Sequence, residues 1–155
     1  MTESINNKKT KTVIFASFTF LSGAMIYILF RPTNLLMFNL LDCIGLMGLT
    51  NSIRPNINDI PEWIIYSLPD GLWLFSYCLF IGCIWNFELK RCFCVLVILP
   101  IYAISHEIMQ KVHFVSGTFD WIDLAAYLTA FVLGFIYIVC NKKESQNESL
   151  TIKVK

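Results

Sequence analysis

The chain has 155 residues, of which 56% are hydrophobic and 15% are charged, and its formal net charge is +1. So few charges cannot cover the surface of an ordinary soluble domain, and a net charge this close to zero gives no basis for nucleic-acid binding. The sequence therefore predicts an all-α integral membrane protein, with room for about four helical crossings of roughly 20 residues and for no further soluble domain.

The first apolar stretch covers residues 12–30, follows a group of lysines and ends at Arg31. Secretory signal peptides have a similar basic flank, but here the apolar run continues past a typical signal core, which favours an uncleaved anchor. Residues 34–50 are also largely apolar, but Asn39, Asp42 and two glycines interrupt them. Such a segment is poor for crossing a bilayer and predicts a helix that lies at the interface or re-enters the membrane.

Three more crossings are expected after a loop at residues 51–62 that is rich in asparagine and proline. They cover residues 68–87, 92–109 and 121–140. Pro100 removes a backbone donor from the middle of the second of these crossings and predicts a kink there. Residues 1–140 are thus expected to form one transmembrane domain, and residues 141–155 a polar tail without a packing pattern.

The distribution of basic residues predicts how the chain is oriented in the cell membrane. Lysine and arginine are enriched in the cytoplasmic loops of membrane proteins. With four crossings and a cytoplasmic N-terminus, only Arg31, Arg54 and Lys111 of the 12 basic residues fall on the outer side. We therefore expect a multi-pass protein with both termini, and the tail, in the cytoplasm.

Two pairs of polar residues flank the short loop between the third and fourth crossings. Glu107 and Gln110 are three residues apart at the end of one predicted helix, and Asp120 and Asp123 are three apart at the start of the next. Residues with this spacing share a helix face, so the two pairs are expected to lie close together. Asp70, near the start of the second crossing, would close the group from a third helix. The sequence thus predicts an acidic pocket that opens outward.

Each acid also has a purely structural explanation. Asp120 is placed to cap the fourth helix, with Asp123 at its third position, and Asp70 follows Pro69 where a helix cap is common. Glu107 is harder to explain in this way, because an acid near a helix C-terminus meets the unfavourable end of the helix dipole. For Glu107 a role in a site is therefore favoured.

The sequence gives little support for metal or redox chemistry. His106 and His113 match no zinc-binding spacing, although two aspartates would suit a loosely held Mg²⁺ or Ca²⁺. The six cysteines lack a Cys-x-x-Cys motif and are interpreted as small buried hydrophobic residues. We therefore expect no firmly bound metal or cofactor, and we assign no catalytic residue.

The acidic group also resembles a family motif. Glu107-Ile-Met-Gln110, the segment Asp120-Trp-Ile-Asp-Leu-Ala-Ala126 and Gly134 resemble the C-terminal signature of the VanZ-like membrane proteins. The resemblance covers about residues 104–134 and implies a small helical protein with several membrane spans. The first described members of that family are linked to teicoplanin resistance without a settled biochemical activity. The resemblance thus implies a role at the cell envelope, with glycopeptide resistance as one form of it.

Three functions remain open from the sequence. The favoured one is a binding or modulating protein whose acidic pocket, formed by Glu107, Gln110, Asp120, Asp123 and Asp70, engages a cell-envelope lipid or another amphipathic molecule. A second is a structural subunit that meets a protein partner or a second copy of itself. The third, least favoured, is a lipid-modifying enzyme in which Glu107 would act as general base.

Overall fold

The structure is a computed structural model that describes residues 2–54 and 60–153, and all regular structure in this part of the chain is helical. Four of the helices contain segments that are long and apolar enough to cross a membrane: Asn6–Phe30, Glu62–Ile84, Leu89–Lys111 and Trp121–Lys142. The prediction of an all-α protein with four such helices is confirmed. The six helices are α1 (Thr2–Phe30), α2 (Leu36–Cys43), α3 (Met47–Ile53), α4 (Glu62–Ile84), α5 (Leu89–Lys111) and α6 (Trp121–Lys153).

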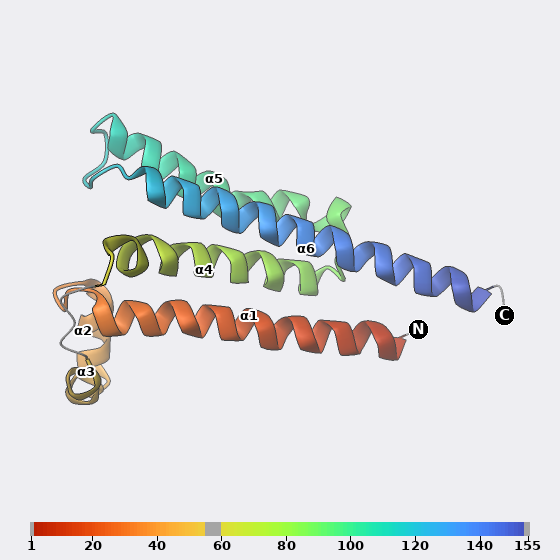
Figure 1. The fold of residues 1–155 in the computed structure, drawn as a ribbon, viewed down its shortest axis with the longest axis horizontal. Helices are drawn as coiled ribbons and strands as arrows, with labels where there is room; N and C mark the ends of the chain where they lie inside the picture. Colours follow the sequence, from red (N-terminus) through yellow and green to blue (C-terminus); the bar gives the residue numbers. More distant parts are fainter. Residues whose placement is uncertain (1, 55–59, 154–155) are drawn as a thin grey trace.

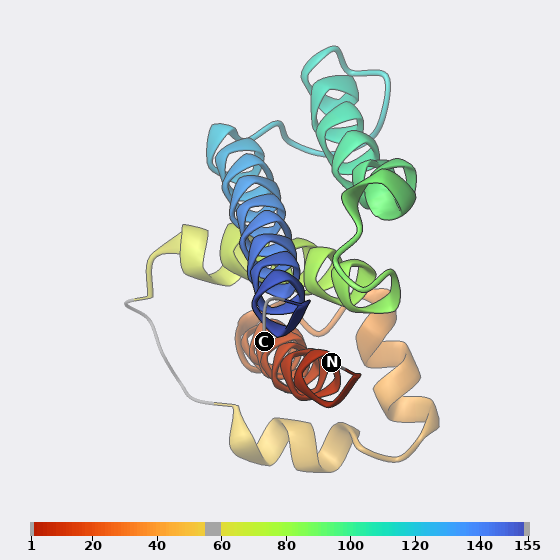
Figure 2. The same cartoon turned by 90° about the vertical axis from the view of Figure 1, so that its right-hand side faces the viewer.

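The long helices lie side by side, and α4 packs against each of the other three (Figures 1 and 2). Both ends of the chain lie at one end of this bundle. The short helices α2 and α3 lie at the opposite end, together with the loop between α5 and α6 (Figure 1). The bundle therefore has a terminal end and a loop end, which differ in composition.

Small residues bring α4 close to its neighbours. A methyl group added to Gly23 of α1 would lie 2.8 Å from Trp73 Nε1, and one added to Gly134 of α6 would lie 2.5 Å from Cys78 Cβ. Small residues at such positions allow membrane helices to approach closely. Tyr77 of α4 donates a hydrogen bond to the carbonyl of Val95, which ties α4 to α5.

A cluster of buried hydrophobic residues lies toward the terminal end of the bundle. Cys78, Leu96 and Ile138, from α4, α5 and α6, are fully buried and belong to one hydrophobic cluster. Cys83 and Cys92 are buried in the same cluster, as predicted for small hydrophobic residues, whereas Cys43, Cys94 and Cys140 are exposed, contrary to that prediction. All six cysteines are free. The loop end lacks such a cluster within the described residues and contains the cavities described below.

The segment at residues 34–50 differs from the single helix that was predicted. It forms α2 and the start of α3, and the break occurs at Gly45, whose φ is +73°. The Gly45 N–H donates to the Asp42 carbonyl, and the Leu46 N–H donates to the Leu41 carbonyl. This pair of bonds is the helix ending that a glycine in the left-handed conformation favours. Both helices are too short to cross a membrane.

Other helix boundaries also differ from the predictions. α4 begins at Glu62 rather than at residue 68, and α3 continues to Ile53 into the expected loop, of which residues 55–59 lie outside the described part. Pro100 lies inside α5, and the kink predicted there stays a prediction. α6 continues to Lys153 and so includes most of the expected polar tail, which stays a prediction, while residues 154–155 lie outside the described part.

Candidate functional site

A polar cavity of about 640 Å³ lies at the loop end of the bundle. All five predicted site residues line it: Asp70 of α4, Glu107 and Gln110 of α5, Asp123 of α6, and Asp120 just before α6. The prediction that these residues lie close together is therefore confirmed. Arg31, Tyr66 and Tyr127 line the same cavity. Its walls thus come from every long helix or from the residues next to it.

Glu107 connects α5 to the start of α6. It is only 4% exposed, and its Oε1 accepts a hydrogen bond of 2.8 Å from the Asp120 N–H. The Asp120 carboxylate in turn caps α6, because its Oδ1 accepts a 2.8 Å bond from the Ile122 N–H. The capping role predicted for Asp120 is confirmed. Glu107 accepts the bond from the Asp120 N–H, one of the backbone donors at the start of a helix that have no partner within the helix.

Gln110 joins Glu107 to the loop between α5 and α6. With its amide oriented to satisfy its neighbours, its nitrogen donates to Glu107 Oε2 and to the Thr118 carbonyl, both at 3.2 Å. Gly117 has a φ of +141°, and a methyl group added to it would lie 2.5 Å from the Gln110 amide. A residue without a side chain is needed there, so the loop can close against Gln110.

Asp123 is the one acid of the pocket with an unsatisfied buried oxygen. It occupies the third position of α6, where an acidic or amide side chain often accepts a bond from the N–H of the capping residue. Here Glu107 accepts that bond instead. Asp123 Oδ1 is buried and has no hydrogen-bond partner within the described part of the chain. A capping role for Asp123 is thus not found, and a buried oxygen without a donor is costly.

Asp70 lies inside α4 and not at its start, so the predicted capping role is wrong. The reason is Arg31, which allows α4 to continue through Pro69. Proline has no N–H to donate to the carbonyl four residues earlier, which is that of Ile65. Arg31 Nε donates to this carbonyl at 3.3 Å, and Arg31 Nη2 donates to the Tyr66 carbonyl at 2.9 Å. The arginine thus replaces the missing backbone donor.

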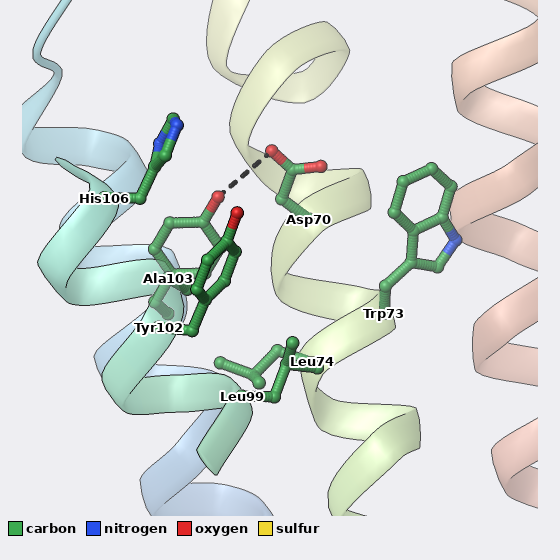
Figure 3. Close-up of a pocket in the computed structure, with 8 residues that line it drawn as sticks. Asp70, Trp73, Leu74, Leu99, Tyr102, Ala103 and His106 are labelled. Carbon is green, nitrogen blue, oxygen red and sulfur yellow. Dashed lines mark hydrogen bonds between the residues drawn. The ribbon is translucent and has the colours of Figure 1, made fainter. Parts of the chain in front are cut away.

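The same arginine lies beside the acid that follows the proline. Arg31 Nη2 is 3.8 Å from Asp70 Oδ2, which also accepts a 3.3 Å hydrogen bond from the Tyr127 hydroxyl (dashed line in Figure 3). The Arg31 guanidinium lies over the ring of Tyr66, 4.7 Å from its centroid. Tyr127 was not among the predicted site residues, although it is four residues after Asp123 and so shares its helix face.

The cavity is acidic overall. Five acidic side chains line it, those of Glu62, Asp70, Glu107, Asp120 and Asp123, and Arg31 is the single lysine or arginine among its lining residues. The guanidinium of Arg31 is already bonded to two backbone carbonyls and lies near Asp70. A bound molecule therefore meets mainly carboxylate and hydroxyl oxygens.

A second, smaller cavity of about 260 Å³ lies next to the first one. The two cavities share Asp70, His106 and Tyr127, and the second runs between α4 and α5 (Figure 3). Farther in, its lining includes the side chains of Leu74, Leu99 and Ala103. A polar chamber at the end of the bundle thus adjoins a mostly apolar cleft between two helices.

Within residues 2–54 and 60–153, no group of three His, Cys, Asp or Glu side chains is placed to hold a metal ion. His106 lines both cavities, whereas His113 lies beyond the end of α5 and lines neither of them.

Comparison with protein-family models, curated proteins and solved structures finds no match to this chain. The resemblance to VanZ-like proteins is neither supported nor contradicted by this result. The functional conclusion therefore depends on the residues of the cavity.

Proposed function

We propose that this chain is a membrane protein that binds a cell-envelope lipid or another amphipathic molecule through the acidic cavity. The observation that carries this proposal is a chamber of about 640 Å³ lined by five acidic side chains, of which Asp123 has a buried oxygen without a donor among the described residues. The neighbouring acids Glu107 and Asp120 have backbone partners, so their positions are explained by folding alone. Asp123 is not explained in that way, because no described residue donates a hydrogen bond to its buried Oδ1.

The charge of the cavity selects the chemistry of the ligand. Five acidic side chains and one arginine line the cavity, and the arginine is already bonded to two backbone carbonyls. An anionic group would therefore be repelled. A cationic group, such as an ammonium, would be attracted and would donate hydrogen bonds to carboxylates. The proposed ligand therefore presents a cationic head group.

The orientation of the protein follows from the same proposal. The basic residues favour cytoplasmic termini, and the termini lie at the end of the bundle opposite to the cavity (Figure 1). The cavity then opens to the outer side of the cell membrane. The short helices α2 and α3 would lie at that interface, because they expose Leu40 and Leu49 beside polar residues, and Ile44 between them is exposed as well. Membership of the VanZ-like family and a role in glycopeptide resistance belong to this proposal.

A structural subunit is the second candidate. It is favoured by the bonds among the acids and the loop, because Glu107, Gln110 and Asp120 together fix the start of α6. Under this alternative the polar residues only stabilise the fold, and the function lies in contacts with a partner chain or a second copy.

A pair of amphiphiles with opposite charge separates the two candidates. The protein in lipid nanodiscs would be incubated with radiolabelled dodecylamine or dodecanoic acid, and the retained amount compared with that of protein-free discs. We expect specific retention of the amine only, its loss in Asp123→Asn and its survival in Asp42→Asn, because Asp42 is an exposed acid on α2 outside the cavity. Equal retention of the amine by all three proteins would reject binding at the cavity and favour the structural subunit.

A further inference from the structure

The cleft between α4 and α5 is the second part of the candidate site. Its lining changes from polar to apolar over a short distance. Asp70 lies at the mouth and Leu74 one helical turn farther along α4, about 6 Å deeper. On α5, His106 is at the mouth and Leu99 lies about 10 Å deeper. The cleft thus leads from the acidic chamber toward the middle of the bundle.

The cleft is also open along its side. Tyr102 and Leu99 line it and are 65% and 36% exposed, on a stretch of α5 that is apolar enough to lie within a membrane. A molecule in the surrounding lipid therefore has lateral access to the cleft. Access from the side suits a hydrocarbon chain that is already in the bilayer, because the chain does not need to pass through water.

We infer that this cleft holds the hydrocarbon chain of the same amphiphile whose cationic head group occupies the acidic cavity. The inference rests on the proposed function and adds the ligand class, a cationic amphiphile with a chain directly attached to the head group. Its basis is adjacency: the side chains of Asp70, His106 and Tyr127 line both spaces, so a head group among the acids lies beside the polar end of the cleft.

Another apolar hollow provides a comparison. A groove of about 520 Å³ lies between α1, α4 and α6, and its lining includes Phe15, Leu72 and Ala125 but no charged residue. It shares no lining residue with the acidic cavity. The groove therefore does not adjoin the acidic cavity through shared side chains, as the cleft does, which makes the groove a suitable control.

The chain gains little free energy merely by leaving lipid for the cleft, because both surroundings are apolar. The position of the chain is therefore the quantity to measure, and affinity alone is not informative. We would use dodecylamine with a diazirine in the middle of its chain, bound to the protein in nanodiscs. After illumination, mass spectrometry of the peptides would identify the labelled residues.

We expect labelling of the part of α4 and α5 that contains Leu74, Leu99 and Ala103. The label should be lost in Ala103→Trp, which fills the cleft, and retained in Ala125→Trp, which places the same side chain in the other groove. It should also be lost in Asp123→Asn, which disturbs only the head-group cavity.

Two results would overturn the inference in different ways. If Asp123→Asn loses the label but the label of the original protein lies in the groove around Ala125, the chain does not occupy the cleft, while the proposed head-group cavity stands. If Asp123→Asn is labelled like the original protein, the amphiphile binds without the acidic cavity, and the proposed function fails together with the inference.

Discussion

Glu107 and Asp123 are acids of the same cavity, but their surroundings assign them different roles. Glu107 is almost fully buried and accepts a bond from the Asp120 N–H, whereas Asp123 has a buried oxygen without a donor. Removal of an acid that accepts a hydrogen bond leaves the buried donor without an acceptor. Removal of an acid whose oxygen has no donor leaves no donor unsatisfied.

The stability of two alanine variants tests this difference. Glu107→Ala should lower the free energy of unfolding by about 1–3 kcal/mol, because the Asp120 N–H and the Gln110 amide lose their acceptor. Asp123→Ala should change it by less than about 1 kcal/mol, because no bond is lost. Reversible unfolding in detergent would measure both. A larger loss for Asp123→Ala than for Glu107→Ala would show that Asp123 is the structural residue.

Arg31 and Pro69 form a pair whose coupling can be measured. Arg31→Lys should destabilise the protein by about 1–3 kcal/mol, because one ammonium does not reproduce the two directed bonds to the Ile65 and Tyr66 carbonyls. In a Pro69→Ala background the helix regains its own N–H, and the cost of Arg31→Lys should be clearly smaller. Equal costs in both backgrounds would mean that Arg31 does not act through the proline.

This pair also shows where sequence reasoning failed at the residue scale. Pro69-Asp70 has the pattern of a helix start, but it lies inside α4, where Arg31, far away in sequence, donates to the Ile65 and Tyr66 carbonyls. The closeness of Glu107, Gln110, Asp120 and Asp123 was predictable, because it depends on local spacing and a short loop. That Glu107 would displace Asp123 from its capping bond depends on the tertiary contact between α5 and α6, which no local pattern contains.

At the scale of the elements, α4 holds the bundle together because it contacts all three other long helices. Hydropathy was sufficient to predict the four long helices, since each crossing needs a long apolar run. Their ends were less predictable: polar residues extend α6 to Lys153, and Gly45 divides the segment at residues 34–50.

Close packing of α4 against α6 predicts a strong effect of a single methyl group. Gly134→Ala places a Cβ 2.5 Å from Cys78 Cβ and should destabilise the protein by about 1–3 kcal/mol, because the two helices must separate. Gly48→Ala in α3 is the matched control, since no atom lies within 4 Å of its added Cβ. It should be neutral or slightly stabilising, because alanine favours helix more than glycine. Thermal unfolding would measure the change in stability of both variants. Equal changes for Gly134→Ala and Gly48→Ala would contradict the close approach of α4 and α6.

At the scale of the whole molecule, the even number of long helices puts the two termini at one end and the cavity at the other (Figure 1). The sequence predicted this arrangement from the count of apolar segments alone. Which end faces outward depends on the surrounding membrane and on the distribution of basic residues, so it needs a separate test.

Labelling of single cysteines in intact cells provides that test. In a variant whose exposed cysteines Cys43, Cys94 and Cys140 are replaced by serine, a membrane-impermeant thiol reagent should label Ser116→Cys in the loop between α5 and α6. It should not label Ser145→Cys near the C-terminus unless the cells are opened. Labelling of Ser145→Cys alone in intact cells would place the acidic cavity on the cytoplasmic side.

The most direct measurement is native mass spectrometry of the protein purified from its own membrane, beside its Asp123→Asn and Asp42→Asn variants. We expect the original protein and Asp42→Asn to retain a cationic amphiphile that Asp123→Asn has lost, while all three remain folded. If all three retain the same lipids in the same amounts, the acidic cavity is not a binding site, and its polar residues serve the fold alone.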